Sequence, residues 1–93
     1  KGNVIYKAFE CVDPYPELAE SISASTGYPA FNSTGSSGGY KDWFVTTSYK
    51  PGLTVEVGDS SLTYAQIADN IDSIFDANRQ VLDICADFVQ DNM

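Results

Sequence analysis

The clearest strand pattern lies in the middle of the chain, between Gly52 and Gly58. Apolar residues alternate there with Thr54 and Glu56, and Gly and Pro close both ends of the run. Because successive strand side chains point to opposite faces, Thr54 and Glu56 share one face. A carboxylate among apolar neighbours is costly unless water, a cation or several donors meet it. Glu56 is therefore either an edge-strand residue facing water or part of a site.

Periodicity predicts one further strand and two helices. The strand covers Asn3–Phe9, and a short amphipathic helix covers Glu17–Thr26 with Gly27 as its stop. The longest element is a helix over Thr63–Gln90, whose apolar residues fall at three-, four- and seven-residue steps. Its expected core-facing stripe consists of Ile67, Ile71, Phe75, Leu82, Cys85 and Phe88, widened by Ile74, Val81, Ile84 and Val89.

This order of elements predicts an α/β fold, with part of a mixed, mostly parallel sheet flanked by helices. Two strands cannot bury both faces of a sheet. We therefore expect residues 1–93 to form a single partial domain, or to associate, for example as a homo-oligomer. The start at Lys1, without an initiator Met or a signal peptide, is typical of a piece of a longer protein.

A loop rich in Gly, Ser, Asn and Pro is predicted between Gly27 and Gly39. Loops of this length in compact domains are usually functional or disordered. It is not a phosphate-binding loop, because it lacks the Gly-Lys-Ser/Thr ending and its nearby cation is Lys41. A flexible linker is disfavoured, because the aromatic residues of Tyr40–Phe44 follow at once and are expected to be buried.

Composition narrows the classes of partner. A hydrophobic fraction of 43% indicates a globular fold, and a net charge of −8 argues against nucleic acid. No apolar run reaches the ~18 residues of a membrane span. The long helix carries an acidic face, for which a solvated surface is favoured over a calcium or partner site. That face consists of Asp69, Asp72, Asp76, Asp83, Asp87 and Asp91.

The chain contains no histidine, which excludes a Ser-His-Asp or Cys-His catalytic site built from this chain alone. The two cysteines, Cys11 and Cys85, lack metal-ligand spacing. They either pair in the fold or remain two free buried thiols. The cysteines therefore do not indicate the cellular compartment of the protein.

Residues 37–43 read Ser-Gly-Gly-Tyr-Lys-Asp-Trp, and Glu56 follows thirteen positions after the tryptophan in Thr-Val-Glu-Val-Gly. This arrangement, ending in a long helix, resembles the last third of the zinc carboxypeptidase family, the carboxypeptidase A-like metallopeptidases. The opening residues 2–6 resemble a stretch of bacterial members, including those that cut γ-D-glutamyl bonds in cell-wall peptides. The resemblance covers nearly all 93 residues. It implies the C-terminal part of that family's catalytic fold.

The resemblance implies that Glu56 is the general base acting on a zinc-bound water. The family's zinc ligands, a His-x-x-Glu pair and a later His, are not in this chain, so Zn2+ would belong to the full-length enzyme. Lys41 matches a specificity-pocket position, and a cation there implies a peptide substrate with a carboxylate, such as glutamate or diaminopimelate. The family tyrosine position falls on Thr34, with Tyr28 and Tyr40 nearby. The implied substrate-contacting residues are Thr34, Ser37, Gly39, Tyr40, Lys41 and Thr54.

Two functions follow for the chain. The first is the C-terminal part of a bacterial zinc metallopeptidase, which would be inactive when isolated. The favoured location of that enzyme is the cell envelope or the extracellular space. The second is a peptide-binding or structural module that lacks the metal-binding half of the enzyme. It would bind peptides with the same loop and pocket. Glu56 favours the first, because a general base has no use without a metal site.

Overall fold

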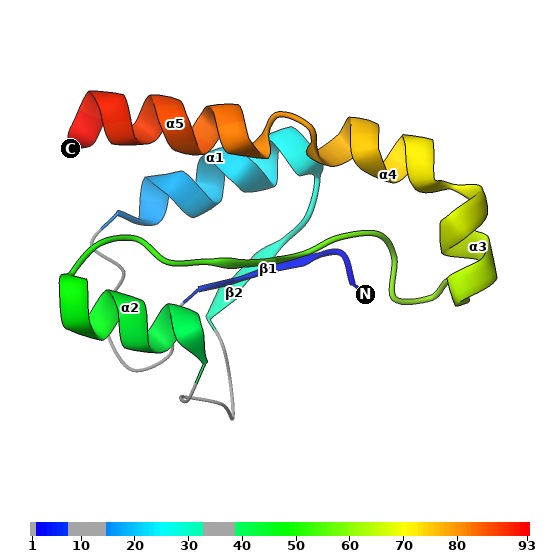
Figure 1. Cartoon of the computed structure of the whole chain (residues 1–93), viewed down its shortest axis with the longest axis horizontal. Coiled ribbons are helices and arrows are strands. Elements are labelled where there is room, and N and C mark those ends of the chain that lie inside the picture. The colour runs from blue at the N-terminus through cyan, green and yellow to red at the C-terminus, as the bar shows by residue number, and fades with distance from the viewer. Residues whose placement is uncertain (1, 8–14, 33–38) are drawn as a thin grey trace.

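The computed structural model describes residues 2–7, 15–32 and 39–93. Their strands form one sheet in the order β2-β1-β3, with β1 at Val4–Lys7, β2 at Ala30–Asn32 and β3 at Thr54–Glu56. β1 pairs in parallel with β2 and antiparallel with β3. The predicted α/β fold, with a mixed sheet flanked by helices, is confirmed (Figure 1).

The register of the sheet separates two sets of side chains. Ile5 lies opposite both Ala30 and Val55, so these three share one face. Val4 lies opposite Glu56 on the other face. The predicted alternation around Glu56 is therefore confirmed, although the regular strand is shorter than the run from which it was predicted.

Helix α1 (Pro16–Thr26) confirms the predicted short helix. Proline suits its first position, because the ring fixes a helical φ and the missing N–H has no partner there anyway. Gly27 ends the helix at φ 77°, and its amide donates to the carbonyl of Ser23 at 2.8 Å. This left-handed end is available to glycine without a Cβ clash.

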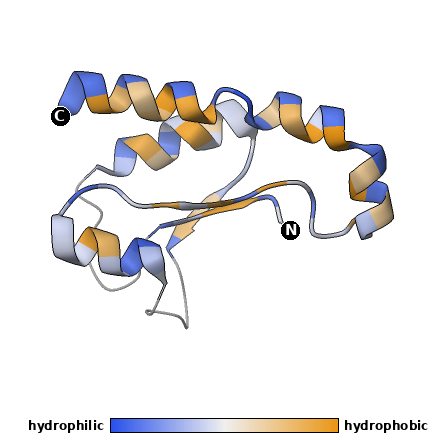
Figure 2. Ribbon diagram, viewed as in Figure 1, coloured by the Kyte–Doolittle hydropathy of each residue, from blue (hydrophilic) through white to orange (hydrophobic). Residues whose placement is uncertain are grey.

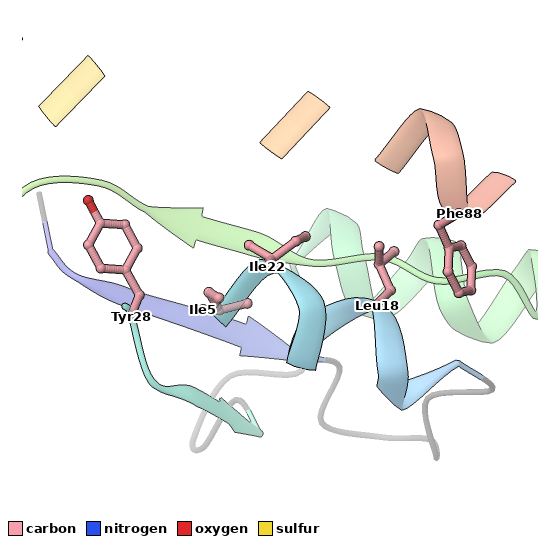
Figure 3. Packing of buried hydrophobic residues seen from close by; sticks show 5 residues of the cluster. All are labelled: Ile5, Leu18, Ile22, Tyr28 and Phe88. Carbon is pink, nitrogen blue, oxygen red and sulfur yellow. The ribbon is translucent and has the colours of Figure 1, made fainter. Parts of the chain in front are cut away.

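The main core lies where α1 packs between the sheet and the C-terminal helices (Figure 1). Hydrophobic residues of α1, β1 and the last helix surround it (Figure 2). Figure 3 shows its five buried members, which come from four segments of the chain: Ile5, Leu18, Ile22, Tyr28 and Phe88.

The single helix predicted over Thr63–Gln90 is wrong, because the structure breaks it into three. They are α3 (Tyr64–Asp69), α4 (Ile71–Asn78) and α5 (Val81–Asn92). Asn70 leaves helical geometry, and its side-chain amide donates to the carbonyl of Gln66 at 2.7 Å. Asparagine competes in this way for the acceptors of a continuing helix.

The start of the long helical segment was predicted correctly. The Thr63 hydroxyl accepts from the amide of Gln66 at 3.2 Å, and the Gln66 side chain accepts from the amide of Thr63 at 2.8 Å. This capping box satisfies donors that the first helical turn leaves without partners.

The predicted core-facing stripe is wrong for four residues that are more than half exposed: Ile71 at 58%, Phe75 at 65%, Leu82 at 80% and Val89 at 52%. Because α1 covers only one side of α4 and α5, the apolar arc is wider than the surface that α1 buries. The members that pack against the core are Val81, Ile84, Cys85 and Phe88. The acidic face is solvated as predicted, since all six aspartates are exposed.

The loop predicted between Gly27 and Gly39 is wrong in part, because β2 lies within it at Ala30–Asn32; residues 33–38 lie outside the described residues. Helix α2 (Tyr40–Ser48) follows and was not predicted. Burial of its aromatics holds only in part. Tyr40 and Trp43 are 74% and 60% exposed, and their rings lie 5.6 Å apart, whereas Phe44 is half-buried.

Over the described ranges, no helix combines the length and apolar character needed to cross a membrane.

Candidate functional site

Glu56 is the last residue of β3, which is an edge strand of the sheet. Its side chain is half-buried and lies against Gly2, at the start of the chain segment that leads into β1. A Cβ atom added at Gly2 would collide with the Glu56 carboxylate and lie 3.1 Å from the Glu56 Cβ. The position of Glu56 therefore depends on a residue without a side chain at Gly2.

The backbone beyond Glu56 is held at two consecutive residues. The carbonyl of Val57 accepts from the amide of Gly2 at 3.1 Å. The amide of Gly58 donates to the Tyr28 hydroxyl at 3.2 Å. Gly58 has φ 90°, a conformation that L side chains rarely adopt. The end of β3 is thus fixed more firmly than a three-residue edge strand would be by its ladder alone.

A cavity of about 330 Å³ opens between α2 and the segment that leads into β3. Thr54 lines it and shares the face of Glu56, whose Cα atom lies two strand residues, or about 7 Å, further along the strand. Apolar groups supply most of the remaining wall. The lining residues are Tyr40, Lys41, Phe44, Pro51, Gly52, Leu53 and Thr54.

Lys41 is one of the residues that line this cavity. Its side chain is only 9% exposed, and its Nζ lies 3.0 Å from Oδ2 of Asp42, which is 1% exposed. Gly39 makes room for this pair, because an added Cβ would lie 3.3 Å from Asp42 Oδ2 and 3.4 Å from Lys41 Nζ. Lys41 therefore does not extend into solvent.

The structure brings several of the residues implied by the resemblance together. Tyr40, Lys41 and Thr54 line one cavity, and Glu56 follows on the face of Thr54. Thr34 and Ser37 lie outside the described residues.

Asp42 and Phe44 were not predicted to have a role from the sequence. A predicted helix over α2 would have placed Phe44 one turn from Lys41 and so on the same wall. Pro51, Gly52 and Leu53, which line the cavity before β3, show no sequence pattern that would have predicted this position.

Tyr28 and Tyr40, the two tyrosines near the family tyrosine position, occupy different environments. Tyr28 is 8% exposed, and its hydroxyl accepts from Gly58 and from Nδ2 of Asn78 at 2.8 Å. Tyr40 is 74% exposed and lines the cavity. Of the two, Tyr40 is the one whose ring a ligand in the cavity would meet.

The described parts of the chain bring no three His, Cys, Asp or Glu side chains together at a distance that could hold a metal ion. Cys85 is a free, half-buried thiol, and burial raises its pKa above the ordinary value. Cys11 lies outside the described residues.

Comparison with known proteins relates the chain to a peptidase. Gamma-D-glutamyl-L-diamino acid endopeptidase 1 of Lysinibacillus sphaericus is 42% identical to it over 64 residues. The matched region covers 66% of this chain and 16% of that protein, so the chain corresponds to a small part of its relative. No protein-family model matches the chain. No solved structure matches it either.

Proposed function

We propose that residues 1–93 are the C-terminal part of the catalytic domain of a zinc metallopeptidase that cleaves γ-D-glutamyl peptides containing a diamino acid, such as those of bacterial cell walls. The observation that carries the proposal is the position of Glu56, at the carboxyl end of an edge strand and two strand residues beyond Thr54, which lines a cavity together with the buried Lys41. Similarity to an endopeptidase of that bond class supports it.

The described residues do not fit zinc on their own, because they bring together no three potential ligands and the chain lacks histidine. In the proposal the metal ligands belong to another part of the longer protein. The steps assigned to this chain therefore concern proton transfer and substrate binding.

Glu56 is the proton carrier of the proposal. Its carboxylate takes a proton from the attacking water and delivers it to the leaving amine as the peptide bond breaks. Support comes from its surroundings: the carboxylate is half-buried, it lies against Gly2, and both following residues are tied down through their backbone. Such support holds a catalytic group in place through its backbone neighbours.

Lys41 is the substrate-recognition residue of the proposal. The stem of a diaminopimelyl side chain would lie against Phe44 and Leu53, and its carboxylate would accept from the Lys41 ammonium. An ammonium has three N–H donors. Asp42 Oδ2, 3.0 Å from Lys41 Nζ, orients it at the wall.

The test is Glu56→Gln in the full-length protein, assayed on a peptide with a γ-D-glutamyl bond to a diamino acid. We expect kcat to fall by about a thousandfold, because loss of a general base typically costs 10²- to 10⁴-fold. Glu20→Gln, at an exposed glutamate of α1, is the matched control and should keep full activity. Retained activity in Glu56→Gln would refute the catalytic role, and the binding-module alternative would then lead.

A further inference from the structure

The Tyr28 hydroxyl joins two segments that are far apart in the sequence. It accepts from the Gly58 amide at 3.2 Å, just beyond β3, and from Asn78 Nδ2 at 2.8 Å, at the end of α4. Figure 3 shows the ring beside Ile5, with the hydroxyl directed away from the rest of the cluster. The hydroxyl is therefore the polar end of a residue whose ring belongs to the core.

Tyr28 is itself held in place from α1. Its amide donates to the Thr26 hydroxyl at 3.2 Å, and its carbonyl accepts from the Ser23 hydroxyl at 2.6 Å. The next carbonyl, of Pro29, accepts from the Ile5 amide at 2.9 Å. The backbone of Tyr28 is thus fixed to both α1 and β1, and its side chain has two torsions left to settle.

Asn78 completes the link on the helical side. Its Nδ2 also donates to the Ile74 carbonyl at 2.9 Å, while its Oδ1 is buried without a hydrogen-bond partner among the described residues. A buried amide with an unmet acceptor is costly. The two bonds that Nδ2 donates, to Tyr28 and to Ile74, are what this side chain contributes to the link.

We propose that Tyr28 is a positioning residue for Glu56, acting through the Gly58 backbone and supported by Asn78. Together with the Gly2 bond to the Val57 carbonyl, the Tyr28 bond fixes the two residues that follow the carboxylate. Tyr28 touches neither substrate nor reacting atoms in this role. The inference rests on the proposed function, since it needs Glu56 to act in catalysis.

The test is a double-mutant cycle in the full-length protein, combining Tyr28→Phe with Glu56→Asp. Phenylalanine keeps the ring in the core and removes both hydrogen bonds. We expect Tyr28→Phe to lower kcat about tenfold to a hundredfold with KM unchanged, because small misplacements of a catalytic group are costly. In the Glu56→Asp background, where the carboxylate is already displaced, the same change should cost less than about twofold.

An equal loss in both backgrounds would overturn the inference, because Tyr28 would then act through general folding. Full activity of Glu56→Asp and of Glu56→Gln would instead refute the proposed function, irrespective of the effect of Tyr28→Phe. Tyr49→Phe, at a tyrosine that is 69% exposed, is the matched control and should change neither constant.

A second variant covers the case in which Tyr28→Phe does not fold. Asn78→Leu removes one of the two bonds to the hydroxyl and leaves Tyr28 in place. We expect a fall in kcat of about threefold with KM unchanged, again absent in the Glu56→Asp background. A loss that persists in that background would contradict the inference.

Discussion

Lys41 and Asp42 are sequence neighbours whose charged groups meet in the interior, at 9% and 1% exposure. Removing two charges from water is expensive, and a buried ion pair is often no more stable than apolar residues of similar size. A contribution to stability therefore does not explain why this ion pair is buried. Lys41 also lines a cavity, and binding a substrate there is the role proposed for its ammonium.

Replacing both members of the pair separates binding from stability. Lys41→Met alone would remove the cation beside a carboxylate that is 1% exposed, whereas Lys41→Met with Asp42→Asn removes both charges. In the full-length protein, we expect the double variant to lose about 10- to 100-fold in kcat/KM on a substrate with a side-chain carboxylate. The matched substrate with an amide in that place should be cleaved as before.

Lys50→Met is the control for this prediction, because Lys50 is exposed and does not line the cavity. It should leave the ratio of the two substrates unchanged. Equal losses of the double variant on both substrates would mean that Lys41 does not recognise the carboxylate.

At the residue scale, the alternation of side chains along a strand predicted correctly which residues share a face. Thr54 and Glu56 share a face because strand periodicity is local. The contact of Glu56 with Gly2 was not predictable in the same way, since it arises from the pairing of β1 with β3 across some fifty residues. The resemblance pointed to Glu56, but the residues that fix it, Gly2 and Tyr28, emerge only with the fold.

At the scale of elements, local signals were sufficient for α1. A proline at its start and Gly27 at its end define both boundaries. β2 was missed because three residues carry too little pattern, and the strand exists through its parallel pairing with β1. The break at Asn70 was missed because apolar spacing continues across it.

The C-terminal helix tests the corrected assignment of buried faces. Phe88 is 8% exposed and packs edge-to-face on Tyr15 at 5.2 Å, whereas Leu82 on the same helix is 80% exposed. We expect Phe88→Ala to lower the free energy of unfolding by about 3 kcal/mol or more. Leu82→Ala should change it by less than about 0.5 kcal/mol. Urea unfolding of the 93-residue chain measures both.

Leu82→Ala is the matched control, because it shortens an aliphatic side chain on the same helix without opening the core. A loss in Leu82→Ala as large as that in Phe88→Ala would contradict the structural assignment. The stripe predicted from periodicity alone would then be correct, with Leu82 buried in the folded chain.

At the scale of the whole molecule, the chain leaves much apolar surface exposed for its size. Ile71, Phe75 and Leu82 on the helices and Tyr40 and Trp43 on α2 are all more than half exposed. The match covers only 16% of its endopeptidase relative. Both observations support the proposal that residues 1–93 are a partial domain, and large exposed apolar areas are the usual mark of surfaces that bind other protein.

Net charge is the other property of the whole molecule, and it predicts how salt changes stability. The chain carries −8, and on α4 and α5 aspartates repeat four residues apart at 72 and 76, and at 83, 87 and 91. Like charges at that spacing destabilise a helix by a few tenths of a kcal/mol per pair. Raising the ionic strength from about 10 mM to about 0.15 M shortens the Debye length from about 30 Å to about 8 Å.

We therefore expect this change to raise the free energy of unfolding by about 1 kcal/mol, measured by urea unfolding at fixed pH. The variant Asp76→Asn with Asp87→Asn interrupts every one of these four-residue pairs. It should start more stable at low salt and lose most of the salt response, because the repulsion that salt screens is already gone. The same response in the variant and the parent chain would place the repulsion elsewhere, and a fall in stability with salt would mean that attraction between exposed charges outweighs it.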